Sequence, residues 1–219
     1  MTTSRATLVD AARLDDDGAA RRWLAGADGE AVAGAALARL NRALYAQRAA
    51  SADPGVHEVT RAQALVVRVG FGAGEEVADG RWTRAVELPG PRDPGRRARA
   101  LVLRPQERLA ALLGGRDVAL ACEELTLRAR ADLDAGRRRE AALQLGVALD
   151  AALAELVPWA QEGGLVARVE ELRAARPRAT AAAAAALEGG LDDAAAADVA
   201  HVLARLEAAL RARTAGTLR

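Results

Sequence analysis

The spacing of apolar residues in the second half of the chain is the feature that most constrains its fold. Ala142, Leu145 and Leu149 succeed one another at intervals of three and four residues. The same intervals recur near the C-terminus, at Val199, Leu203, Leu206 and Leu210. Such spacing places side chains on one face of an α-helix. We therefore predict an all-α fold, with helices over 117–135, 137–157, 165–175 and 180–187 and a last helix capped by Asp192 or Asp193.

Short turns between these helices predict stacked helical hairpins. Gly136 separates the first two helices, and helices joined by so few residues pack antiparallel. The segment 129–158, with its turn glycine and closing Pro158, resembles one hairpin of the tetratricopeptide type. The aromatic positions of such repeats are not filled, however, and their period of about 34 residues does not recur. The sequence thus predicts tetratricopeptide-like packing without membership of that family.

Helix signals also occur in the first fifty residues. Ser4 is placed to cap a helix over 5–14. The acidic run 15–17 precedes a second helix, and negative charge there favours the positive end of the helix dipole. A longer helix is expected over 29–50, where leucines at three- and four-residue spacing form one apolar stripe.

The segment 64–88 is ambiguous between strand and helix. It begins as a buried strand would, and its glycines suit a loop after that strand. An internal comparison favours a helix over 62–78 instead, because Gly80-Arg81 aligns with Gly136-Arg137 at an offset of 56 residues. Each glycine inside such a helix would cost about 1 kcal/mol relative to alanine. We favour the helix and keep a small β excursion within 64–88 as the alternative.

Prolines and glycines mark the clearest break in the chain. Three prolines and two glycines lie between Pro89 and Arg99, and they stop any regular element. We predict an N-terminal helical region over 1–88, a linker or loop rich in Pro, Gly and Arg over 89–104, and a C-terminal helical-hairpin region over 105–219. The two helical regions are expected to form one continuous array.

Missing residue types exclude several kinds of site. The chain contains no lysine, which excludes a Walker-type phosphate loop, a Schiff base and a lysine general base. Cys122 is the only cysteine, so there is no intrachain disulfide and no cysteine-cluster zinc site. His57 and His201, the only histidines, have no metal-motif neighbours. The sequence therefore predicts no catalytic, metal-binding or cofactor-binding residue, and we expect a protein that is not an enzyme.

The side chains that could carry chemistry have structural interpretations. Glu123 and Glu124 point about 100° apart on a helix and are expected on a solvated edge. Cys122 falls on the apolar stripe, where a buried cysteine behaves as a small hydrophobic residue; the alternative is a nucleophile. His57 is expected in a loop and His201 on the surface.

Arginines at the start of one helix form a small cluster. The helix dipole disfavours positive charge at Arg137, Arg138 and Arg139. We therefore expect these side chains to have partners, with the carboxylates of Asp132 and Asp134 just upstream as candidates.

The strongest functional signal is a group of arginines in the linker. The segment 89–104 carries one opposing acid, Asp93. Guanidinium groups bind carboxylates and phosphates through paired hydrogen bonds. Lysine, isoleucine and asparagine, whose codons are A/T-rich, are absent or nearly absent from the chain. A GC-rich genome is therefore an alternative explanation for the abundance of arginine. The residues predicted to bind a partner or an anion are Arg92, Arg96, Arg97, Arg99 and Arg104.

The function expected from these features is a non-catalytic helical protein that binds or scaffolds another protein. A groove between stacked hairpins would hold a peptide or partner helix. The alternative is a nucleic-acid-associated protein that uses the Arg-rich loop 89–104, although no aromatic residue lies among the arginines. A homodimer through Val199, Leu203, Leu206 and Leu210 is a further alternative to packing of these residues within the chain.

The location expected from the sequence is cytoplasmic. The N-terminal residues contain no apolar stretch that resembles a signal peptide. No run of about 18 apolar, uncharged residues predicts a membrane span. A lone cysteine suits a reducing compartment, and the net charge of +1 provides no strong field to attract polyanions.

Overall fold

The computed structural model describes residues 3–90, 106–160 and 165–217. The chain divides into two compact units, Met1–Asp93 and Pro94–Arg219. The division falls within the predicted linker 89–104. Most described residues are helical, and a single two-stranded sheet is present in them. The predicted all-α fold with a small β excursion within 64–88 is therefore confirmed.

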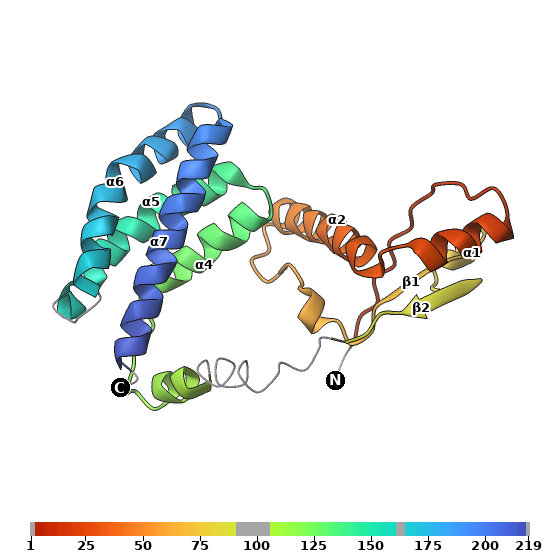
Figure 1. Cartoon of the computed structure of the whole chain (residues 1–219), viewed down its shortest axis with the longest axis horizontal. Helices are drawn as coiled ribbons and strands as arrows, with labels where there is room; N and C mark the ends of the chain where they lie inside the picture. Colours follow the sequence, from red (N-terminus) through yellow and green to blue (C-terminus); the bar gives the residue numbers. More distant parts are fainter. Residues whose placement is uncertain (1–2, 91–105, 161–164, 218–219) are drawn as a thin grey trace. The chain divides into compact units, whose positions relative to one another are not determined.

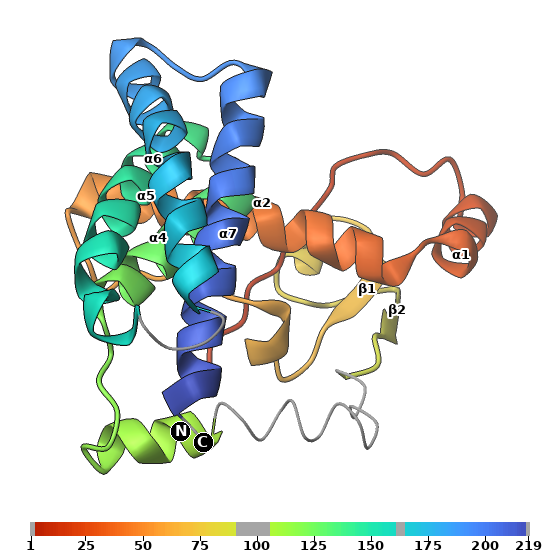
Figure 2. The same cartoon turned by 60° about the vertical axis from the view of Figure 1, so that its left-hand side comes forward.

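Four long helices form the body of the C-terminal unit (Figures 1 and 2). Along the chain, α4 packs on α5, α5 on α6, and α6 on α7. The last helix also contacts α4 and α5, so the second hairpin packs back on the first. The predicted stacking of helical hairpins is confirmed. The helices are α4 (Ala121–Asp134), α5 (Arg138–Glu155), α6 (Leu165–Glu188) and α7 (Asp193–Thr217), with a short 3-10 helix η3 (Val157–Trp159) after α5.

The core of this unit is built from the stripes that the sequence spacing predicts. Leu145 and Leu149 of α5 are fully buried, and so are Leu203 and Leu206 of α7. Burial of one leucine side chain contributes roughly 1.5–3 kcal/mol. All four residues of the expected seam on α7, Val199, Leu203, Leu206 and Leu210, lie in this core. Packing within the chain therefore accounts for their spacing.

One prediction about these helices is wrong. The helices expected over 165–175 and 180–187 are a single helix, because α6 continues through Pro177 from Leu165 to Glu188. Pro177 and Arg173, whose carbonyl would have accepted the missing N–H bond, are both exposed, so water can satisfy that carbonyl. Packing of α6 against α5 and α7 outweighs the cost of the proline, about 3 kcal/mol.

In the N-terminal unit, both long helices begin at an aspartate cap. The Asp16 carboxylate accepts from the Ala19 amide at 2.6 Å at the start of α1 (Asp17–Gly26). Asp28 accepts from two amides at the start of α2 (Gly29–Ser51). The capping role predicted for the acidic run and the helix predicted over 29–50 are confirmed. No helix forms over 5–14, where the structure shows an irregular segment.

The helix favoured for 62–78 is also wrong, because this segment contributes a strand to a hairpin. Strand β1 (Arg68–Phe71) pairs antiparallel with β2 (Arg84–Glu87), with Gly70 opposite Ala85. A Cβ atom on Gly70 would lie 2.3 Å from the Arg84 carbonyl oxygen. Close approach of the partner strand therefore requires glycine here. Two 3-10 turns, η1 (Arg61–Gln63) and η2 (Glu75–Val77), flank β1.

The internal sequence match at an offset of 56 residues reflects one type of helix-ending turn, which both segments contain. Gly80 and Gly136 have φ angles of 74° and 75°, in the left-handed region that favours glycine. The next amide, of Arg81 or Arg137, donates to the carbonyl five residues back, at 3.0 Å and 2.8 Å. This is the Schellman pattern of a helix end. The same turn closes η2 in one unit and α4 in the other, and it is followed by different elements.

The N-terminal unit has a thin core. Among its described residues, 3–90, only Ala20, Val69 and Val77 are buried. Helix α2 has no buried residue, and it is joined to the following loop by Asn41, whose side chain exchanges two hydrogen bonds with the Val59 backbone. The described helices include none that is long and apolar enough to cross a membrane.

Candidate functional site in the C-terminal unit

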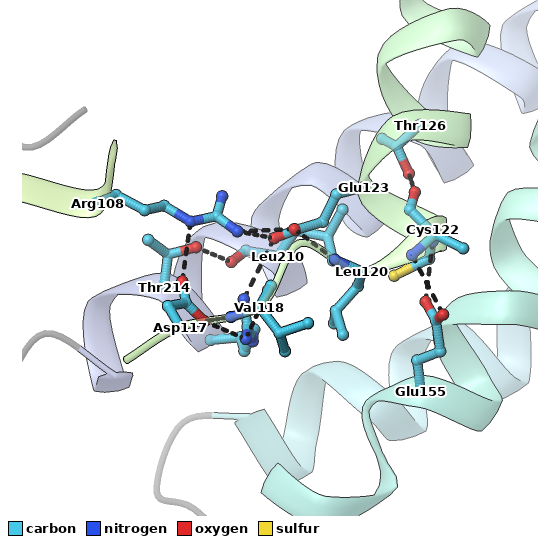
Figure 3. A network of polar contacts seen from close by, with 12 residues as sticks. Arg108, Asp117, Val118, Leu120, Cys122, Glu123, Thr126, Glu155, Leu210 and Thr214 are labelled. Carbon is cyan, nitrogen blue, oxygen red and sulfur yellow. Dashed lines mark hydrogen bonds and ion pairs between the residues drawn. The ribbon is translucent and has the colours of Figure 1, made fainter. Parts of the chain in front are cut away.

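Residues 106–113 are helical and precede the four long helices in the sequence. We call these described residues the arm helix. Its Arg108 side chain reaches two carboxylates (Figure 3). Nη2 donates to both carboxylate oxygens of Glu123 at 2.7 Å, and Nε donates to Asp117 at 3.2 Å. Hydrogen bonds of this kind, in which donor and acceptor are both charged, are stronger than those between neutral groups.

A second arginine, Arg213 of α7, completes a cluster around the same carboxylates. Its side chain is fully buried, and Asp117 is 2% exposed. Nη2 of Arg213 donates to Asp117 Oδ1 at 2.6 Å and to the Val118 carbonyl at 3.3 Å. The guanidinium carbon lies 4.6 Å from the centre of the Trp159 ring, in the geometry of a cation–π contact. We call Arg108, Asp117, Glu123 and Arg213 the ion-pair cluster.

The electrostatics of the cluster hold its charges in place. Burial raises the pKa of Asp117, but hydrogen bonds from the Val118 amide and from Arg108, together with the charge of Arg213, outweigh burial and leave that pKa lowered. Burial lowers the pKa of Arg108, but the bonds to Glu123 and Asp117 leave it raised. Two guanidinium groups face two carboxylates, so the formal charges cancel. Carboxylates bound in this way are suited to joining elements and poorly suited to taking a proton from a substrate.

Beside the cluster, Glu155 caps the start of α4. This residue lies at the end of α5, and its carboxylate accepts from the amides of Ala121 and Cys122 at 3.2 Å and 2.9 Å (Figure 3). The amide of Leu120 donates to Glu123 at 3.0 Å. Three amides that the helix leaves without partners are thereby satisfied. Burial raises the pKa of Glu155, but the bonds from Cys122 and Ala121 leave it lowered.

Cys122 lies in an environment that keeps it protonated. The residue is fully buried. Burial, together with the hydrogen bond to Glu155 and the negative charges of Glu155 and Glu123, raises the pKa of its thiol to about 12. A nucleophilic cysteine needs the thiolate and exposure. The expectation that Cys122 acts as a small hydrophobic core residue is supported, and the nucleophile alternative is not.

Other residues singled out in the sequence are placed as follows. The five arginines of the linker, Arg92, Arg96, Arg97, Arg99 and Arg104, lie outside the described residues. His57 and His201 are exposed, as expected. Glu124 lies on a solvated edge and pairs with Arg128. Glu123 does not, because its carboxylate turns into the ion-pair cluster.

The three arginines at the start of α5 have partners, as predicted. Arg137 pairs with Asp132 at 2.7 Å. Arg138 pairs with Asp193 at the start of α7, also at 2.7 Å. Arg139 donates to the Ala186 carbonyl near the end of α6. These side chains join the helices, although only the Asp132 contact was anticipated.

Arg108, Asp117 and Arg213 were not among the residues that the sequence pattern predicts as functional. One signal could have found Arg213, because it lies three residues after Leu210 and continues the spacing of the buried seam. A charge at a buried position of a helix needs a buried partner. That partner, Asp117, lies 96 residues away, and no local pattern indicates it.

No group of three or more His, Cys, Asp or Glu side chains that could hold a metal ion occurs in the parts of the chain that the structure describes. Arg173 and Arg176 line a shallow groove on α6, and they form ion pairs with Glu170 and Asp150.

Comparisons of the chain with protein-family models, with curated proteins and with solved structures found no match.

Proposed function

We propose that the protein is a non-catalytic interaction or scaffold protein whose partner is another protein. The observation that carries this proposal is the exposed apolar face of the arm helix. Leu109 and Leu113 lie one turn apart on this helix and are 55% and 81% exposed. Leucines spaced in this way are typical anchors for a partner helix or peptide.

The arm helix is a better candidate for docking than a groove between hairpins. Helix α7 contacts both α4 and α5, so the apolar faces of the two hairpins pack on each other. The ion-pair cluster holds the arm helix on this packed unit through Arg108. A homodimer through the seam of α7 forms no part of the proposal, because Val199, Leu203 and Leu206 are already buried within the chain.

The charge of the preceding segment indicates what kind of partner fits. Five arginines and one aspartate lie between Pro89 and Arg104, immediately before the arm helix in the sequence. An acidic, amphipathic peptide or helix would offer carboxylates to these arginines and apolar side chains to Leu109 and Leu113.

A cytoplasmic location stays a prediction from the sequence.

The test is a crosslinked pull-down of the tagged chain from its native cells, with and without nuclease. We compare the wild type with Leu109→Gln/Leu113→Gln and with a variant in which the five linker arginines are glutamine. The matched control is Leu127→Gln/Leu187→Gln, which changes two leucines of similar exposure elsewhere on the unit. One buried leucine contributes about 2 kcal/mol, so loss of both anchors should weaken binding more than about tenfold.

A nuclease-resistant protein partner that is lost from the Leu109/Leu113 variant and kept by the control is the expected result. Loss from the arginine variant as well would assign the acidic contacts to the linker. If the control variant lost the partner to the same extent, the arm helix would not be the docking site. Recovery of nucleic acid, with partners that disappear after nuclease treatment, would favour the alternative function, and phosphate contacts would then make binding fall steeply with salt.

A further inference from the structure

The arm helix is attached to the C-terminal unit with little apolar burial. Of its residues 106–113, Ala111 alone is buried, and Arg108 and Leu112 are partly buried. The remaining side chains, including both leucine anchors, are exposed. Most of the stability of a helix in a protein comes from tertiary packing of one of its faces. The helical state of residues 106–113 therefore depends on the contacts that hold them against the unit.

Arg108 supplies that attachment. It makes three hydrogen bonds at 2.7–3.2 Å to Glu123 and Asp117. Its side chain is 23% exposed, so the pair lies at the edge of the unit, within reach of solvent ions. An attachment of this kind is weakened by salt, whereas apolar packing is not.

The chain around the arm helix allows it to leave without disrupting the unit. Gly114 and Gly115 follow it, both exposed, and Gly115 has a φ of 68° with no atoms near the position of a Cβ. Arg213 also contacts Asp117 and Glu123, at 2.6 Å and 3.4 Å. Release of the arm helix therefore leaves both carboxylates with a positive partner.

We infer that the arm helix is an ionically held arm, which detaches from the C-terminal unit and unfolds when the contacts of Arg108 with Glu123 and Asp117 are screened or removed. The trigger is ionic strength acting on a pair at the edge of the unit. The buried pair of Arg213 and Asp117 is screened much less, so the four long helices stay folded. This inference does not rest on the proposed function and needs no partner for its test.

The test is hydrogen–deuterium exchange of the full chain, followed in peptides from the arm helix and from α5. In Arg108→Gln, we expect exchange of the arm-helix amides to rise at least about tenfold, because opening of a segment sets its exchange rate. Exchange in α5 should not change. The matched control is Arg116→Gln, the same substitution at an exposed position beyond the glycines, and it should exchange like the wild type.

The wild-type chain provides a second measurement that needs no variant. Raising the salt from about 0.1 M to about 1 M shortens the screening length from about 10 Å to about 3 Å, and arm-helix exchange should rise while α5 exchange stays constant. The inference would be overturned if the hydrogen-exchange rate of the arm-helix amides changed neither with salt nor on loss of Arg108. Equal increases in the arm helix and α5 would overturn it as well, since Arg108 would then stabilise the whole unit.

Discussion

Arg213 donates a hydrogen bond to Oδ1 of Asp117 over 2.6 Å, although the two residues lie 96 positions apart in the sequence. The contact joins the C-terminal part of α7 to the segment just before α4. Both side chains are almost fully buried, where an ion pair is screened little by solvent. The end of the chain is thereby tied to the beginning of the four long helices.

Removing Arg213 should destabilise the C-terminal unit strongly. Arg213→Met keeps apolar bulk but leaves Asp117 buried with Arg108 as its remaining positive partner. Breaking a buried pair from one side costs about 3 kcal/mol or more, and urea unfolding followed by circular dichroism would measure it. Arg211→Met is the control, because Arg211 is exposed and lies 4.0 Å from Glu207; a change below about 0.5 kcal/mol is expected there. Similar values for the two variants would contradict the buried role of Arg213.

Acid should weaken the same contact. The pKa of Asp117 is lowered in the folded protein, so the stability it contributes is present above its unfolded pKa and is lost as the pH falls through the folded pKa. We expect the wild type to be more stable than Asp117→Asn near neutral pH, and this difference in stability to narrow as the pH falls below about 4. Urea unfolding at several pH values would measure the difference. A difference that stays constant with pH would show that ionisation of Asp117 does not stabilise the fold.

Cys122 should be unreactive in the folded chain. A shift in the pKa of its thiol from 9.0 to about 12 reduces the thiolate fraction about a thousandfold at neutral pH, and burial blocks access as well. Reaction with a thiol reagent such as dithionitrobenzoate should therefore be slow in buffer and fast in concentrated urea. Fast labelling of the folded protein would show that the α4 end opens readily.

Two glycines in and beside α5 should respond to alanine in opposite ways. A Cβ on Gly146 would meet Ala183 at 3.5 Å, an ordinary contact, so Gly146→Ala should stabilise the helix by about 0.5–1 kcal/mol. Gly136 has a positive φ of 75°, so Gly136→Ala should destabilise by about 1 kcal/mol. Thermal unfolding of both variants would compare them. Destabilisation by Gly146→Ala would indicate that α5 and α6 pack too closely there for a methyl group.

The sequence predicts the helices of the C-terminal unit well where one apolar stripe faces the core. Leu145 and Leu149 are buried as the spacing requires. The prediction fails at Pro177, because packing on both neighbours of α6 outweighs a local helix-breaking signal. It also fails at Gly70. This glycine is required by the close approach of strand β2, which begins 14 residues later in the sequence. No local pattern around Gly70 reveals that strand.

The candidate site was less predictable than the fold, for a related reason. Glu123 looked like one of two adjacent acids on a helix, and its partners Arg108 and Arg213 lie 15 and 90 residues away. Pairing across such distances follows from the tertiary arrangement. The arginines of the linker, which the sequence singled out most clearly, lie outside the described residues, so their role stays a prediction.

Capping of α4 by Glu155 has a consequence for the order in which the chain folds. The first turn of α4 receives its acceptor from the last turn of α5, so α4 on its own has no acceptor for those two amides. The two helices are therefore expected to form together as a hairpin, and their contacts are close in sequence, which favours rapid formation. The pair of Arg213 with Asp117 joins residues 96 positions apart, and we expect it among the last contacts to form after the transition state.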